Sequence, residues 1–150
     1  MAQIKLTTLE NLLDINEEIK RKSLSDPRIE YSGDRIYPVK IYKLSALINS
    51  VPVYRSVFEI TAYYLKNIIL LQAFPDANHR TALSTVEMFL KINGYSFNYA
   101  PEDAYQFRKE LYARRMREYK TYEEMPISVL KEKDNQVFSL CLDFVKAHTK

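Results

Sequence analysis

The chain has 150 residues, 47% of them hydrophobic, which is enough for one domain with a substantial core. Its formal net charge of +3 is too small to indicate, on charge alone, a protein that binds nucleic acid. One cysteine excludes an internal disulfide, and the presence of only 2 glycines and 6 prolines argues against a turn-rich all-β fold.

The sequence carries no signal for export or membrane insertion. Residues 1–8 lack the apolar core of a signal peptide, and no apolar run reaches the length of about 18 uncharged residues that a membrane-spanning helix needs. No repeat, low-complexity tract or linker divides the chain. We therefore expect a single domain, residues 1–150, in the cytoplasm, and no membrane partner.

The first predicted helix follows a capping box. Thr7 is suited to the N-cap and Glu10 to the third helical position, and an apolar stripe then continues to about Lys20. Two short β-like runs flank Gly33 in the polar stretch that follows, which predicts a small flap or hairpin at residues 28–38. An irregular surface loop is the alternative for these residues.

The next two helices are predicted at residues 39–50 and 53–73. The second of them is apolar on nearly all sides, a pattern typical of a helix in the middle of a bundle. Ser50 and Pro52 suit its start. Pro75 ends it near residue 73, because proline disfavours the helical conformation of the residue before it.

Three more helices are predicted after Pro75. The first starts at Asn78 or His79, with Asp76 or Asn78 as its N-cap, and ends before Gly94. The others lie at residues 101–119 and within residues 125–149. Together these patterns predict an all-α fold, a compact bundle of about six helices around residues 53–73.

The segment between the third and fourth predicted helices carries a carboxylate, an amide and a guanidinium within five residues. The N-terminus of a helix presents unpaired backbone N–H groups to an anion, and Arg80 adds a planar fork suited to phosphate. Asp76 is suited to hold Mg²⁺ beside phosphate oxygens. The residues thus predict a metal-assisted polyphosphate site, whereas ordinary helix caps and a solvated arginine are the alternative interpretation.

This segment resembles the signature of the Fic/Doc (Fido) family, His-x-Phe-x-Asp/Glu-Gly/Ala-Asn-x-Arg. The positions in register are Phe74, Asp76, Ala77, Asn78 and Arg80. The residues that follow, Thr81-Ala82-Leu83, resemble the death-on-curing branch, and the likeness extends over about residues 4–96. The resemblance implies an all-α Fic/Doc-like fold and transfer of AMP or phosphate from ATP or another nucleoside triphosphate to a protein hydroxyl.

The resemblance also implies roles for single residues. Asp76 would hold Mg²⁺, and Ala77, Asn78, His79 and Arg80 would hold the nucleotide phosphates. The bulky His79 stands where AMP-transferring members have glycine, and bulk there is associated with the phosphate-transferring branch. A target or antitoxin protein would dock by strand addition at the flap of residues 28–38.

One position departs from the family. The catalytic histidine should stand two residues before Phe74, and this chain has Gln72 there. A carboxamide cannot accept a proton from an attacking hydroxyl at neutral pH, whereas imidazole can, and such general-base assistance is typically worth about 10² to 10⁴ in rate. We therefore expect transfer activity to be weak or lost. His148, near the chain end, does not replace the missing base.

Two other functions are consistent with the sequence. The first is a non-catalytic binding partner or decoy in a toxin–antitoxin pair. The second is a helical nucleic-acid-binding protein that uses the basic residues 108–120, with Tyr112 and Tyr119 available for stacking on bases. Glu110 and Glu118 interrupt this basic run, so a solvated helix face is the favoured interpretation, and nucleic acid is not the partner that we expect.

Overall fold

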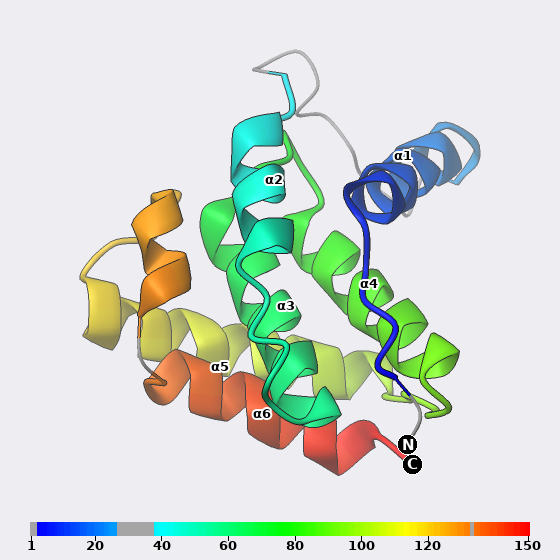
Figure 1. The fold of residues 1–150 in the computed structure, drawn as a ribbon. Coiled ribbons are helices and arrows are strands. Elements are labelled where there is room, and N and C mark those ends of the chain that lie inside the picture. The colour runs from blue at the N-terminus through cyan, green and yellow to red at the C-terminus, as the bar shows by residue number, and fades with distance from the viewer. Residues whose placement is uncertain (1–2, 27–37, 133) are drawn as a thin grey trace.

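A computed structural model of the chain describes residues 3–26, 38–132 and 134–150 (Figure 1). In chain order its helices are α1 (Leu9–Ser25), α2 (Ile41–Asn49), α3 (Val57–Leu71), α4 (Asn78–Ile92), α5 (Pro101–Tyr119), the 3₁₀ helix η2 (Ile127–Lys131) and α6 (Gln136–His148). The predicted all-α class is confirmed, and the described residues contain no strand beyond an isolated bridge between Phe97 and Thr149. Apart from Pro38, the predicted flap at residues 28–38 lies outside the described residues.

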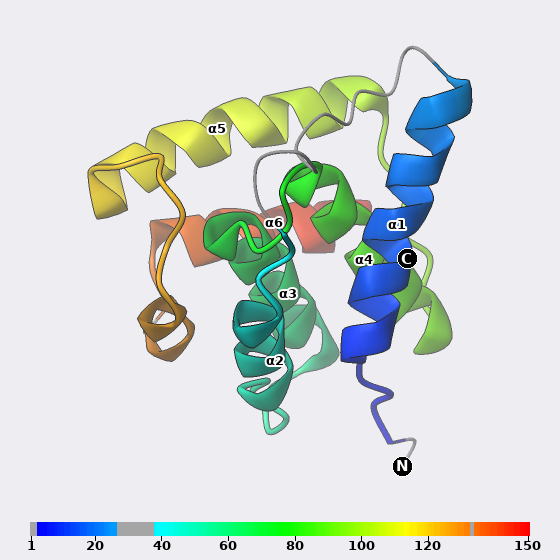
Figure 2. The same ribbon diagram turned by 90° about the horizontal axis from the view of Figure 1, so that it is seen from above.

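Helix α3 is the centre of the bundle, as its all-round apolar pattern predicts. Every residue from Ile60 to Leu71 is buried, and α3 packs against α2, α4, η2 and α6. Figure 2 shows α1 and α5 on two different sides of this centre. The start of α3 was predicted too early: its N-cap is Ser56, whose hydroxyl and backbone N–H form a capping box with Glu59, and residues 51–56 form turns instead.

The start of α1 also differs from the prediction. The N-cap is Thr8, one residue later than expected, and its hydroxyl accepts a hydrogen bond from the N–H of Asn11. Thr7 is instead held from outside the helix, because its N–H donates to the hydroxyl of the buried Tyr64 on α3. A tertiary contact therefore decides which of two adjacent threonines caps the helix.

The end of α4 and the start of α5 are as predicted. Gly94 has φ +90°, and the N–H groups of Gly94 and Tyr95 donate to the carbonyls of Lys91 and Leu90. This pair of bonds is the Schellman arrangement, which needs a residue in the left-handed conformation. Pro101 is the first residue of α5, where its missing N–H leaves no helical hydrogen bond unmade.

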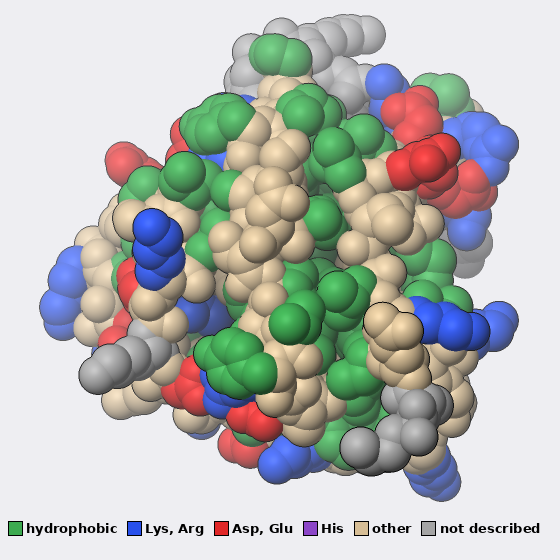
Figure 3. Space-filling model, in the orientation of Figure 1, with side chains coloured by type: hydrophobic (Ala, Val, Ile, Leu, Met, Phe, Trp, Pro, Cys, Tyr) green, Lys and Arg blue, Asp and Glu red, His purple; other side chains and the backbone are tan. Residues whose placement is uncertain are grey.

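The surface is mixed in character. On the face shown in Figure 3, hydrophobic side chains are spread across the middle, and charged side chains of both signs lie toward the edges. Ile41 and Tyr42 of α2 are among the exposed hydrophobic residues. Within the part of the chain that the structure describes, each helix is too short or too polar to cross a lipid bilayer.

Candidate functional site

The loop between α3 and α4 begins and ends with a residue in the left-handed region. Gln72 has φ 46° and ψ 50°, and Ala77 has φ 63° and ψ 30°. This conformation costs an L-residue roughly 1–2 kcal/mol, so the loop stores strain at both ends. The N-cap of α4 is Ala77, and no side chain caps this helix, contrary to the prediction of Asp76 or Asn78 in that role.

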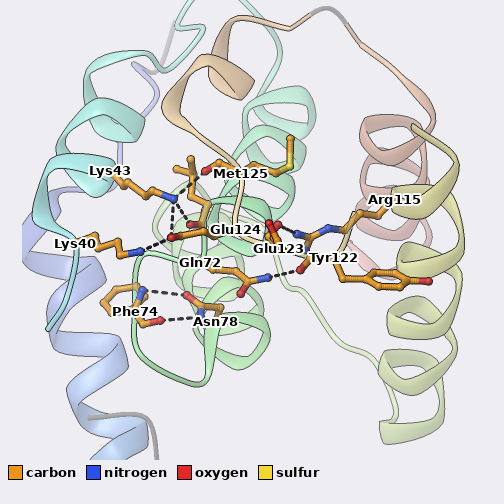
Figure 4. Close-up of polar contacts among 11 residues, drawn as sticks. Lys40, Lys43, Gln72, Phe74, Asn78, Arg115, Tyr122, Glu123, Glu124 and Met125 are labelled. Atoms are coloured by element: carbon orange, nitrogen blue, oxygen red, sulfur yellow. Dashed lines mark hydrogen bonds and ion pairs between the residues drawn. The ribbon is translucent and has the colours of Figure 1, made fainter. Parts of the chain in front are cut away.

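The side chain of Asn78 closes the loop instead. Its Oδ1 accepts a hydrogen bond from the N–H of Phe74 at 3.2 Å, and its Nδ2 donates to the carbonyl of Phe74 at 3.0 Å (Figure 4). The ring of Phe74 is buried in the core. Phe74 and Asn78 together hold the loop on the bundle, so the amide of Asn78 supports the site from within the loop.

Two more contacts hold the loop from outside. Asn16, buried on α1, donates through Nδ2 to the carbonyl of Asp76 at 3.1 Å and to Oγ1 of Thr81 at 3.0 Å. The N–H of Lys40 donates to the carbonyl of Ala73 at 2.8 Å. The strained backbone is therefore fixed by groups that lie far from it in the sequence.

A cleft lies beside this loop, and we call it the loop cleft. Its volume is about 240 Å³. It is lined by Ile69, Gln72, Pro75, Asp76, Ala77, Asn78, His79, Arg80, Arg108, Tyr112 and Arg115. The six residues that the resemblance selected, Gln72 and 76–80, thus line one cleft, and α5 supplies its opposite wall.

Sequence reasoning missed the three α5 residues of this cleft. They belong to the basic run 108–120, which was interpreted as a solvated face or a nucleic-acid patch. Arg115 is instead only 1% exposed, and its guanidinium donates to the carbonyls of Thr121, at 3.3 Å, and Glu123. None of the described carboxylates forms an ion pair with it. Burial lowers the pKa of Arg115, yet a guanidinium stays charged at neutral pH.

The cleft has an excess of positive charge. Arg80, Arg108 and Arg115 line it together with a single carboxylate, Asp76. Because no side chain caps α4, the first N–H groups of this helix add a partial positive charge at the same place. The arrangement is suited to an anion with several oxygen atoms, because guanidinium groups and helix N-termini both bind phosphate well.

His79 is not suited to act as a general base. Its ring packs against Tyr112, with 5.8 Å between ring centroids, and its Nε2 has no hydrogen-bond partner among the described residues. Burial, with the charges of Arg108 and Arg115, lowers the pKa of His79 to about 3. The imidazole is therefore neutral at pH 7 and too weak a base to take a proton efficiently there.

The remaining wall is held by the segment after α5. The Nε2 of Gln72 donates to the carbonyl of Tyr122 at 3.4 Å (Figure 4). Beside it, the buried Lys43 donates to the carbonyls of Leu71 and Met125, both at 2.8 Å, and to Oε2 of Glu124 at 2.9 Å. This lysine ties α2 and the end of α3 to the segment that also binds Arg115.

The carboxylate content of the cleft limits how it can hold a metal. Among the described residues there is no group of three or more His, Cys, Asp and Glu side chains that could hold an ion. Asp76 is the one carboxylate of the cleft, and its Oδ1 accepts a hydrogen bond from the N–H of Ala77 at 2.6 Å. One carboxylate is compatible with Mg²⁺, which in phosphate sites takes its other ligands from phosphate oxygens and water.

Comparison with known proteins gives a family but no activity. The model of a family described as "Family of unknown function (DUF8172)" matches residues 1–109, which include the whole α3–α4 loop. No curated protein and no solved structure matches the chain. Arg115, the buried wall of the cleft, lies beyond the matched residues.

Proposed function

We propose that this chain, which belongs to the DUF8172 family of unknown function, binds the Mg²⁺ complex of a nucleoside triphosphate such as ATP in the loop cleft. The observation that carries the proposal is the combination of three arginines, one carboxylate and an uncapped helix N-terminus around one cleft. The resemblance of residues 74–80 to the Fic/Doc signature supports the same ligand.

In the proposed complex Asp76 holds Mg²⁺, which neutralises phosphate charge and links the nucleotide to the loop. Arg80 and the N–H groups at the start of α4 hold phosphate oxygens from one side. Arg108 and the buried Arg115 hold them from the α5 side. Asn78 acts by keeping the loop closed through Phe74.

We further propose that the bound nucleotide is transferred slowly or not at all. AMP or phosphoryl transfer to a protein hydroxyl needs a group that removes the hydroxyl proton. Gln72 cannot do so, and the low pKa of His79 leaves it ineffective. A non-catalytic partner or decoy in a toxin–antitoxin pair is therefore the second candidate. A target or antitoxin protein would dock at residues 28–38, in the cytoplasm.

The observed contacts of α5 do not favour a nucleic-acid-binding surface. Arg114 donates to Glu110 at 3.0 Å, and Arg117 lies 3.6 Å from the same carboxylate. Arg115 is turned inward. Three basic residues of this helix are therefore paired with an acidic residue or turned inward, which lowers the charge that α5 offers to a phosphate backbone, and Arg108 and Lys109 remain exposed.

Titration calorimetry with ATP, GTP and CTP, each with and without Mg²⁺, tests the proposal. We expect binding that needs Mg²⁺ and that weakens at least about tenfold in Arg108→Ala, since this exposed arginine contacts only Tyr112 in the described structure. Arg114→Ala, on the same helix and outside the cleft, is the matched control. Absence of binding at millimolar nucleotide, or an equal loss in both variants, would refute the proposal.

A further inference from the structure

A second hollow lies beside α3, and we call it the lysine cavity. Its volume is about 370 Å³, within the usual size range of small-molecule sites. It is formed by the α2–α3 connection, the middle of α3, the end of η2 and the start of α6; Figure 1 shows η2 beside α2 and α3. The residues that give it chemistry are Arg55, Tyr63, Lys66, Asn67, Glu132 and Asp134. It shares no lining residue with the loop cleft.

Two adjacent residues of α3 bring to this cavity polar atoms that have no hydrogen-bond partner among the described residues, and the Oδ1 of Asn67 is the one that is fully buried. Lys66 is 4% exposed, and its amine makes no hydrogen bond or ion pair with any described residue. Asn67 is 2% exposed; its Nδ2 donates to the carbonyl of Tyr63 at 3.0 Å, whereas its Oδ1 has no partner. Buried polar groups without partners cost stability, so their presence in a cavity wall points to a ligand that satisfies them.

Lys43 shows what a satisfied buried lysine looks like in the same molecule. It is 3% exposed, and its three N–H donors are matched by two carbonyls and the carboxylate of Glu124. Lys66 is equally buried and has no such set of acceptors. Glu132 and Asp134 also line its cavity, but Asp134 is bound by Arg55 at 2.6 Å.

Burial is therefore the largest influence on the Lys66 amine. It lowers the pKa of Lys66, and the more distant charges of Glu132, Asp134 and Glu118 oppose this only in part. A larger share of the amine is then neutral at pH 7 than for a lysine in water. The neutral amine is the form that attacks a carbonyl carbon.

We propose that the lysine cavity binds a small α-hydroxy aldehyde or ketone, which forms an imine with Nζ of Lys66 while its hydroxyl donates to Oδ1 of Asn67. The nitrogen lone pair forms the new C–N bond. The carbonyl oxygen leaves as water with both amine hydrogens, and a C=N bond remains. No oxidant, reductant or further reactant is required. The hydroxyl of the ligand supplies the hydrogen-bond donor that Oδ1 of Asn67 lacks. Imine formation converts the unpaired amine of Lys66 into a C=N group.

Reductive trapping tests this assignment on the intact chain. The protein is incubated at pH 7 with glycolaldehyde and sodium cyanoborohydride, and the adducts are located by peptide mass spectrometry. We expect Lys66 to be modified at least about tenfold faster than the equally buried Lys43, and faster than Lys91, which is exposed on α4. Modification of Lys66 that is no faster than that of Lys91, in protein whose helical circular dichroism is intact, would overturn the proposal.

Propionaldehyde, which has no hydroxyl, tests the part assigned to Asn67. Wild-type Lys66 should react several-fold faster with glycolaldehyde than with propionaldehyde, relative to Lys91 in the same sample. Asn67→Leu should remove this preference while Lys66 remains reactive toward both. Equal relative rates for the two aldehydes in the wild type would show that the cavity does not recognise the hydroxyl, and the assigned ligand class would be wrong.

Discussion

The loop cleft and the lysine cavity both border α3, yet they treat their polar groups in opposite ways. In the loop cleft two polar side chains hold the protein itself: Asn78 holds Phe74, and Arg115 binds two carbonyls, whereas Nε2 of His79 has no partner among the described residues. In the lysine cavity the amine of Lys66 and the Oδ1 of Asn67 have no partner among the described residues. The cleft also contains strained backbone, whereas none of the residues that line the cavity has a positive φ.

This difference separates two kinds of site. Guanidinium groups held by backbone carbonyls keep a permanent charge, so the loop cleft can attract anions at any physiological pH. A buried amine without acceptors is closer to neutrality, so the lysine cavity is suited to a neutral polar molecule. Substitutions in each region test this difference between the two sites.

The greatest change should be a gain of activity in the loop cleft. Gln72→His introduces a base at the position that holds the histidine in the Fic/Doc signature, and, if the chain has the proposed function, the rate of label transfer from ATP to protein should rise by about 10² to 10⁴. We expect the lower end of this range, because burial and nearby arginines lower the pKa of an imidazole in this cleft, as they do for His79. The left-handed backbone at position 72 is compatible with this change, since histidine adopts that region more often than most residues.

A second substitution separates a restored base from unrelated labelling. Gln72→His combined with Asp76→Ala should return to the wild-type level, because the metal that supports the developing charge is lost. Equal labelling in the wild type and in Gln72→His would indicate that the base is elsewhere or that the cleft has lost the other groups that transfer needs. Labelling that persists in the double variant would place the reaction outside the cleft.

The two buried lysines should respond in opposite directions to the same substitution. Lys43→Met leaves two carbonyls and Glu124 without their donor, and we expect a loss of about 3 kcal/mol in the free energy of unfolding. Lys66→Met removes an unpaired amine and should leave this free energy unchanged or raise it by about 1 kcal/mol. Urea unfolding measures both; a loss in Lys66→Met as large as that in Lys43→Met would mean that Lys66 has acceptors after all.

The pH dependence of stability should report on His79. Its pKa is about 3 in the folded protein and about 6.5 when the chain is unfolded, so the unfolded state binds the extra proton between these values. Stability is then complete above pH 6.5 and falls below it by about 1.4 kcal/mol per pH unit, or about 2 kcal/mol by pH 5. Urea unfolding at pH 7, 6 and 5 measures this slope, and His79→Gln should abolish it.

Titration of the carboxylates does not account for a change in stability between pH 6.5 and 5. Glu59, Glu124 and Asp134 have lowered pKa values, mainly because of hydrogen bonds with Ser56, Lys40 and Arg55 respectively. Their contribution is present above the unfolded pKa of about 4.5 or less and is lost only as pH falls below it. A slope between pH 6.5 and 5 that persists in His79→Gln would therefore show that another group causes it, and a wild type without a slope would show that His79 binds its proton in the folded state.

The smallest expected effect concerns the strained backbone. Ala77→Gly removes the strain of a left-handed alanine backbone, which costs roughly 1–2 kcal/mol. Glycine in turn loses more conformational entropy on folding, which costs about 0.5–1 kcal/mol. We expect a net stabilisation of up to about 1 kcal/mol in urea unfolding. Ala73→Gly, in the same loop but with an ordinary backbone, should instead lose about 1 kcal/mol. Destabilisation of both by the same amount would mean that the loop carries no strain at residue 77.

Local patterns were sufficient for the helices and insufficient for some of their ends. The all-round apolar pattern identified α3 as central, and Gly94 and Pro101 marked their helix ends correctly. The start of α3 was misplaced because Ser50 and Ser56 both precede helix-forming residues. The packing of the helix against the rest of the bundle decides which of two such serines is the N-cap, and the sequence of one segment does not show this packing.

The candidate site divides in the same way. The residues from Gln72 to Arg80 are contiguous, so a motif could select them together. Arg115 could not be selected, since a buried arginine and a solvated one look alike in a basic run, and its acceptors come from a segment that follows α5. In the sequence, Lys66 only interrupts an apolar helix. The cavity beside it becomes visible only once η2 and α6 are placed in the fold.

The support that Asn16 gives to the loop has a consequence for protein engineering. A graft of residues 71–81 into another helical hairpin would keep the clasp between Phe74 and Asn78, because both partners travel with it. It would leave behind Asn16, which lies 60 positions before Asp76, and the N–H of Lys40. The transplanted turn would keep its conformation, but it would no longer be oriented toward the arginines of α5. The transferable unit is thus the scaffold from α1 to α5, and loop libraries should be built within it.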